Sequence, residues 1–89
     1  MKLNEQCMKD ILKYLVEKIN ITDNGVYCGC KIVEIQKHFE PQYSAKETAY
    51  AINKLFELKY INMDLHGKSW NDNHSIDDVT YAGHKYLES

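Results

Sequence analysis

The sequence contains no arginine, and all eleven of its basic residues are lysines. Arginine supplies the planar, two-pronged donor that reads guanine and grips phosphate, so its absence argues against strong sequence-specific DNA recognition. A chain rich in Lys, Asn and Ile without Arg is also what an AT-rich genome produces. That compositional explanation stays open beside the functional one.

Cysteine is scarce, and its count is odd: Cys7, Cys28 and Cys30. An odd count with two cysteines so close together does not suit a disulfide framework, and reduced thiols in a cytosolic domain fit better. Zinc sites typically separate paired cysteines by about two to four residues and add a second paired cluster, which is missing here. We therefore expect no metal and no cofactor, although Cys28 and Cys30 could be joined by other soft ligands: His38, His66, His74 and His84.

Long apolar runs are also missing, so we expect no membrane-spanning segment. The first ten residues, MKLNEQCMKD, become charged too early for a signal peptide, which predicts a cytoplasmic protein. No glycine-rich phosphate loop, nucleophile elbow or metalloprotease His-Glu pair is present, and we therefore expect no enzymatic activity. At 89 residues with 44% hydrophobic content, the chain (residues 1–89) suits a single globular domain.

The clearest element is a helix within residues 43–60. Ser44 and Glu47 have the Ser-x-x-Glu spacing of a capping box. At about 100° per residue, one side of this helix is apolar and predicts a buried stripe, made of Ala45, Thr48, Ala49, Ile52, Leu55 and Phe56. We expect the centre of the core to combine both main helical stripes: Leu12, Leu15, Ile52, Leu55 and Phe56.

The remaining pattern predicts an α+β winged helix-turn-helix domain, with a three-helix core, a β-wing and a short C-terminal helix. Its other elements are a helix over 4–20, strands over 26–28, 60–65 and 76–79, a wing loop over 66–74 and a helix over 81–87. Residues 31–40 are ambiguous. Ile32, Ile35 and Phe39 have helical spacing, but the density of β-branched residues also permits a strand. We choose the helix, which Pro41 ends.

Two stretches, YSAKETAYAINKL at 43–55 and VTYAGHKYL at 79–87, carry a resemblance. They resemble a small bacterial and phage-associated winged-helix-like family of unknown function, which usually ends in Leu-Thr-x-x-Gly-His-x-Phe-Leu. The resemblance implies the fold and a phage or prophage setting, and it implies no activity. Lys59 departs from the family, which usually has glycine there. A lysine in the left-handed conformation costs about 1 kcal/mol more than glycine.

Gly83 lies inside the expected last helix. A glycine there costs about 1 kcal/mol relative to alanine, and close approach of a neighbouring element is the usual compensation. We therefore expect Gly83 to pack against another part of the backbone.

The first functional hypothesis is weak binding of duplex DNA by a small regulatory protein, with the helix of residues 43–60 in the major groove. Lysines would contact phosphates, and Tyr50 and Asn53 would meet base edges, since Asn suits adenine. The residues expected at this site are Ser44, Lys46, Tyr50, Asn53, Lys54 and, in the wing, Lys68. Because residues 44–58 carry equal numbers of lysines and glutamates, the expected basic footprint is missing.

The alternative hypothesis is an adaptor that keeps the winged-helix fold without binding DNA. Trp70, Tyr50 and Tyr60 could then form an exposed aromatic surface for a protein partner or for self-association, because aromatic side chains often anchor interfaces. Trp70 could equally fold back onto the sheet edge and serve only packing.

Overall fold

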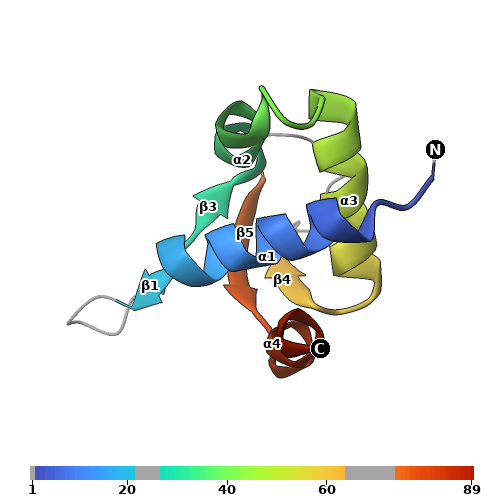
Figure 1. Ribbon diagram of the computed structural model, residues 1–89. Coiled ribbons are helices and arrows are strands. Elements are labelled where there is room, and N and C mark those ends of the chain that lie inside the picture. Colours follow the sequence, from blue (N-terminus) through green and yellow to red (C-terminus); the bar gives the residue numbers. More distant parts are fainter. Residues whose placement is uncertain (1, 22–26, 64–73) are drawn as a thin grey trace.

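The computed structural model describes residues 2–21, 27–63 and 74–89, which form an α+β fold with four helices and a small three-stranded antiparallel sheet (Figure 1). The elements in chain order are α1 (Glu5–Lys18), β1 (Asn20–Ile21), β2 (Tyr27–Cys28), β3 (Cys30–Lys31), α2 (Ile32–Phe39), α3 (Ala45–Glu57), β4 (Ile61–Met63), β5 (Ser75–Val79) and α4 (Tyr81–Glu88). None of these helices is long and apolar enough to cross a membrane.

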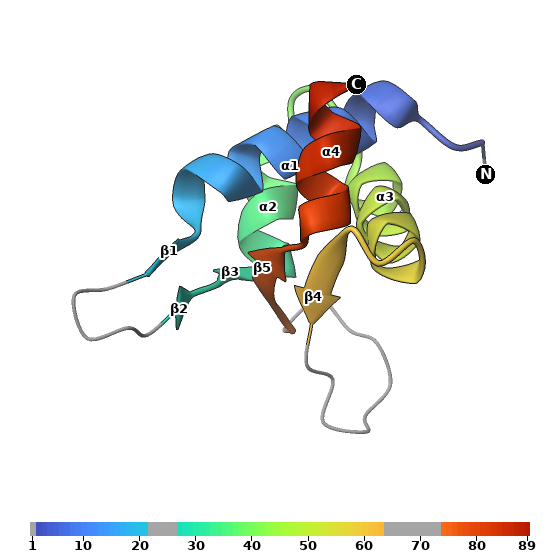
Figure 2. The ribbon, with the colours of Figure 1, turned by 90° about the horizontal axis from the view of Figure 1, so that it is seen from below.

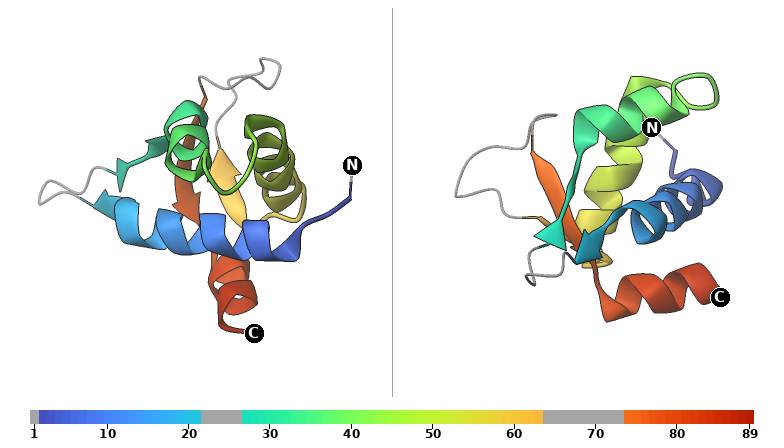
Figure 3. Two further views of the ribbon diagram at one scale, coloured as in Figure 1. Left: turned by 45° about the horizontal axis from the view of Figure 1, so that its top comes forward. Right: turned by 90° about the vertical axis from the view of Figure 1, so that its left-hand side faces the viewer.

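The helices gather on one side of the sheet (Figures 2 and 3). Helix α1 crosses the middle of the molecule, with α2 and α4 on opposite sides of it (Figure 1). Helix α3 packs against both α1 and α2. This arrangement leaves the outward sides of α2 and α3 in solvent.

The three-stranded sheet has the order β3-β5-β4, so the strand before α2 pairs with the last strand. Our expectation of a first strand at 26–28 is wrong for this sheet. Its first strand is β3, paired through Cys30 with Ile76, whereas β2 pairs back with β1 in a separate two-stranded ladder. Gly29 lies close against β5, because a Cβ there would be 2.6 Å from the Ile76 carbonyl oxygen.

Strand β5 contains a bulge that explains its irregular sequence. Ile61 pairs with Val79 and Asn62 with Asp78, but Met63 pairs with Ile76, which leaves Asp77 as the extra residue. The bulge lets Ile76 and Val79 both enter the core while Asp77 stays exposed. The expected short, irregular strand at 76–79 is confirmed. Residues 64 and 65 of the expected strand 60–65 lie outside the described residues.

The ambiguous segment 31–40 forms helix α2, as we chose. Ile32 and Ile35 are fully buried and Phe39 nearly so, which matches the helical spacing of these three side chains. The turn to α3 is closed by bonds from the Gln42 and Tyr43 backbone N–H groups to the Phe39 carbonyl oxygen.

The core is centred where α1 and α3 meet, and four of its five expected central residues are fully buried: Leu12, Leu15, Ile52 and Leu55. The expectation for Phe56 is wrong, because this ring is only partly buried at the edge of the core. The buried face of α3 is rotated from the predicted stripe. Ala51 is buried while Ala45 is exposed, because α3 must cover both α1 and α2.

Three helices begin with a side-chain cap. Asn4, Ser44 and Thr80 each accept a bond of 3.0–3.1 Å from the backbone N–H three residues later. Only half of the expected capping box forms, because the Glu47 carboxylate accepts a 3.4 Å bond from the Asn4 side chain instead. This bond links the start of α1 to the start of α3.

The end of α3 meets the start of α4 at a compact junction. Lys59 has a φ of 62°, so the lysine does adopt the left-handed conformation. The Lys59 backbone N–H donates to the Phe56 carbonyl oxygen, and the Tyr60 backbone N–H donates to the Leu55 carbonyl oxygen. These two bonds form the pattern of a Schellman motif. The Thr80 hydroxyl donates to the Lys59 carbonyl oxygen at 2.7 Å, and the Thr80 backbone N–H donates to the Tyr60 carbonyl oxygen at 3.0 Å.

Candidate nucleic-acid interface

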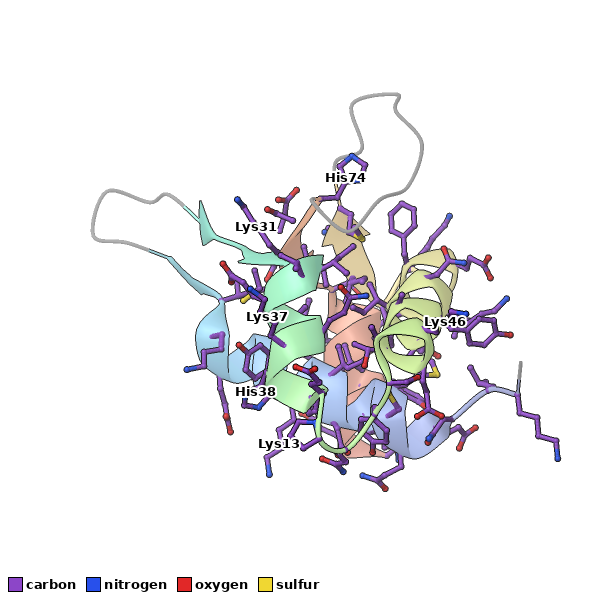
Figure 4. All side chains as sticks on the ribbon, turned by 90° about the horizontal axis from the view of Figure 1, so that it is seen from above. Lys13, Lys31, Lys37, His38, Lys46 and His74 are labelled. Atoms are coloured by element: carbon purple, nitrogen blue, oxygen red, sulfur yellow. The ribbon has the colours of Figure 1, made fainter. Side chains whose placement is uncertain are left out.

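The outward side of α3 carries the predicted site residues that the structure describes. Lys46 is exposed in the first turn and points away from the helix (Figure 4). Tyr50, Asn53 and Lys54 follow along the same side and are partly exposed. The Ser44 hydroxyl is used as the cap of the helix. Lys68, expected in the wing, lies outside the described residues.

Two of these side chains, Asn53 and Lys54, bind Glu57, and the third, Tyr50, lies beside the Lys54 ammonium. The Lys54 ammonium lies 3.0 Å from Glu57 Oε2 and 5.3 Å from the centre of the Tyr50 ring. Asn53 Nδ2 donates to Glu57 Oε1 at 3.5 Å. The hydrogen bond to Glu57 raises the pKa of Lys54 above its usual value. Of the predicted phosphate contacts on α3, Lys46 alone has no acidic partner among the described residues.

Two lysines that sequence reasoning did not place at the site, Lys31 and Lys37, also border this side of the molecule. Figure 4 shows Lys31 and Lys37 around α2, Lys46 on α3, and His74 beside the start of α2. The His74 carbonyl accepts a 3.0 Å bond from Ile32 N–H, which links the start of α2 to the residue before β5. Lys31 and Lys37 are exposed and form no ion pair within the described residues.

The sequence held a weak signal for these two lysines. Once Ile32, Ile35 and Phe39 are assigned to the buried side of a helix, Lys37 must lie on the solvent side. Its position relative to Lys46 depends on how α2 packs against α3, and that is not readable from either segment alone.

A hollow of about 480 Å³ separates α2 from the start of α3. Gln36, only 9% exposed, spans the two helices by donating from Nε2 to the Ala45 carbonyl at 3.1 Å. The lining mixes charge and apolar surface: Val33, Gln36, Lys37, Glu40, Ser44 and Ala45. With acidic and basic side chains on the same rim, the hollow has no strong preference for anions.

The exposed acids limit how positive this surface becomes. Glu34 lies on α2 between Lys31 and Lys37, Glu40 directly follows this helix, and Glu57 stands on α3. A phosphate backbone would therefore meet a few separated cations rather than a continuous basic strip, and each contact would add little affinity.

The aromatic residues of the alternative hypothesis have separate packing roles. Tyr60 stacks on Tyr86 of α4, with ring centres 4.8 Å apart, while Tyr50 lies under the Lys54 ammonium. Trp70, the third of these residues, lies outside the described residues. The described part of the structure therefore does not show a shared aromatic surface.

The described cysteine side chains are suited to packing. Cys7 is fully buried and Cys30 is 6% exposed, and both are free thiols. Burial raises the pKa of Cys7 to about 12 and that of Cys30 above its usual value. Thiols that stay protonated are poor nucleophiles and poor metal ligands. The side chain of Cys28 lies outside the described residues, so the expectation of no metal stays a prediction.

Comparison with protein-family models, with curated proteins and with solved structures found no match to this chain. The resemblance to the phage-associated family therefore stays a prediction.

Proposed function

We propose that this chain is a winged-helix module that binds duplex nucleic acid weakly, mainly through phosphates. The observation that carries the proposal is the order α1, β3, α2, α3, β4, β5 together with the sheet order β3-β5-β4. In a winged helix, a strand before the helix-turn-helix pairs with the hairpin that follows it. The exposed α3 face and the lysines around α2 support the same reading.

In this proposal α3 is the recognition helix. Its outward side enters the major groove, where Asn53 suits adenine and Tyr50 offers a flat ring to the base edges. Lys46 contacts a phosphate at the start of the helix. Lys31 and Lys37 contact the backbone beside it, because they border the same side of the molecule without an acidic partner in the described residues (Figure 4).

The number of lysines without an acidic partner in the described residues determines the expected affinity for the duplex and its salt dependence. Each neutralised phosphate contributes roughly 0.9 to the slope of log affinity against log salt. Lys31, Lys37 and Lys46 therefore correspond to a slope of roughly −3 per monomer, with micromolar affinity at low salt, in the non-specific range. A regulatory role in a phage or prophage setting rests on the sequence resemblance alone.

The test is a charge reversal at Lys46, followed by the fluorescence anisotropy of a labelled AT-rich 20-base-pair duplex at low salt. Lys46→Glu places a negative charge in the first turn of α3, where the helix dipole favours it, so folding should be unharmed. We expect affinity to fall about tenfold, because one contact is lost and a repulsion is added. Lys85→Glu on α4 is the matched control, since α4 lies across α1 from α2 (Figure 1).

Equal loss in the two variants would show that only overall charge matters and would reject the α2–α3 face. No binding by the wild-type protein at micromolar concentration would reject the nucleic-acid proposal itself. The adaptor hypothesis, with Trp70 and Tyr50, would then take first place.

A further inference from the structure

Glu57 occupies an unexpected position on a surface meant for a polyanion. Its two carboxylate oxygens accept from two different neighbours on α3, one from Lys54 at 3.0 Å and the other from Asn53 at 3.5 Å. Asn53 is the residue that the proposed function uses for a base edge, and Lys54 is a phosphate contact that the sequence predicted but that the proposed function does not count, because Glu57 pairs with it. One acidic side chain therefore holds both of them.

Resting on the proposed function, we propose that Glu57 is a specificity-determining residue that withholds Lys54 and Asn53 from arbitrary DNA. To contact a phosphate, Lys54 must leave Glu57, and the freed carboxylate then repels the same backbone. To read a base, Asn53 must exchange its bond to Glu57 for one to the base edge. Only a duplex that offers both a phosphate to Lys54 and a suitable base edge to Asn53 compensates for the two bonds lost to Glu57.

The geometry makes this release feasible. Glu57 and Lys54 have 54% and 33% of their side chains exposed, so water screens the pair and little stability depends on it. Side-chain pairs at i,i+3 and i,i+4 on a helix surface stabilise the helix only weakly, so replacing Glu57 by another partner has a small cost. The centre of the Tyr50 ring lies 5.3 Å from the Lys54 ammonium, so a cation–π contact with Tyr50 remains when Glu57 is replaced.

The experiment replaces Glu57 by Gln, which keeps the helix propensity and the oxygen that Asn53 uses. The probe is the same labelled AT-rich duplex, titrated at several salt concentrations. We expect Glu57→Gln to bind at least fivefold more tightly than wild type, with the salt slope steeper by about 0.9, because Lys54 becomes one further phosphate contact. Because the wild type recovers this cost only on a duplex that also suits Asn53, the gain should be larger on a GC-rich duplex than on the AT-rich one, and the preference between sequences should shrink.

Helix α4 offers a matched control. Lys85 and Glu88 form a similar i,i+3 pair at 3.9 Å, so Glu88→Gln makes the same charge change away from the proposed interface. Equal gains from Glu57→Gln and Glu88→Gln would overturn the inference, since net charge alone would explain them. Glu57→Gln should also lose its gain in a Lys54→Gln background, and a gain that persists there in full would overturn the release mechanism.

The two proposals fail in different ways. If Lys46→Glu weakens binding but Glu57→Gln leaves it unchanged, the inference about Glu57 is wrong and the proposed function stands. If neither wild type nor Glu57→Gln binds the duplex at micromolar protein, both are wrong.

Discussion

Replacing Gly83 by alanine tests how closely α4 is packed onto the end of α3. A Cβ at this position would lie well inside the contact distance of the Tyr60 carbonyl oxygen and only 2.8 Å from Val79 Cγ1. The carbonyl cannot simply move aside, because it accepts the Thr80 N–H at 3.0 Å. Backbone on both sides of the contact is therefore held in place, and α4 must shift to make room.

Two opposing effects decide how much Gly83→Ala changes the free energy of unfolding. Helix propensity favours alanine over glycine by about 1 kcal/mol. Overpacking against a fixed neighbour costs roughly 1–3 kcal/mol, and more when the neighbour is backbone that cannot yield. We take the upper part of that range and expect Gly83→Ala to lower the free energy of unfolding by about 2 kcal/mol, a large share of the stability of an 89-residue domain.

Urea denaturation followed by circular dichroism at 222 nm measures this difference. Ala82→Gly is the matched control, because Ala82 is exposed in the same turn and should show only the propensity loss of up to about 1 kcal/mol. A Gly83→Ala protein that is as stable as wild type, or more stable, would show that propensity wins and that the junction is looser than described.

Three further predictions concern stability and use the same urea denaturation. Lys59→Gly should stabilise the protein by about 1 kcal/mol, because Lys59 holds a φ of 62° that glycine adopts without strain; a loss would contradict this. Thr48→Val should raise stability by about 1 kcal/mol, since Thr48 Oγ1 is buried without a hydrogen-bond partner in the described residues; destabilisation would reveal a bond made in solution. Tyr43→Phe should cost about 1–2 kcal/mol at pH 7, because the Tyr43 hydroxyl donates to Asp10 at 2.6 Å. That hydrogen bond raises the pKa of Tyr43 to about 12, so its contribution is complete below pH 10, the ordinary tyrosine value, and is lost as pH rises towards 12. A Tyr43→Phe difference that does not shrink over that range would contradict the assignment.

Local signals predicted much of the fold. Helix α3, the helical choice for 31–40 and the cap at Ser44 all follow from spacing within one or two turns. The expectation that Gly83 meets a neighbouring backbone is confirmed, although the neighbour itself could not be named in advance. These features are determined by residues close in sequence, which is why a pattern detects them.

Features set by distant contacts were missed. A two-residue strand carries no periodicity, so nothing local distinguishes β2 from β3, and the choice depends on which one reaches Ile76. The buried face of α3 includes Ala51 rather than Phe56 because two helices share that face. At the candidate site, the Lys54–Glu57 spacing was visible in the sequence. The position of Lys37 relative to Lys46 was not, since it depends on the packing of α2 against α3.

The most direct test of the proposed function is the salt dependence of duplex binding by the wild-type protein. Fluorescence anisotropy with the labelled AT-rich duplex should be recorded from roughly 20 to 200 mM salt, with the oligomeric state followed in parallel by light scattering. For a monomer, we predict a slope of log affinity against log salt of roughly −3, from phosphate contacts by Lys31, Lys37 and Lys46. A slope shallower than about −1, or no binding at the lowest salt, would contradict a phosphate-binding role for this face.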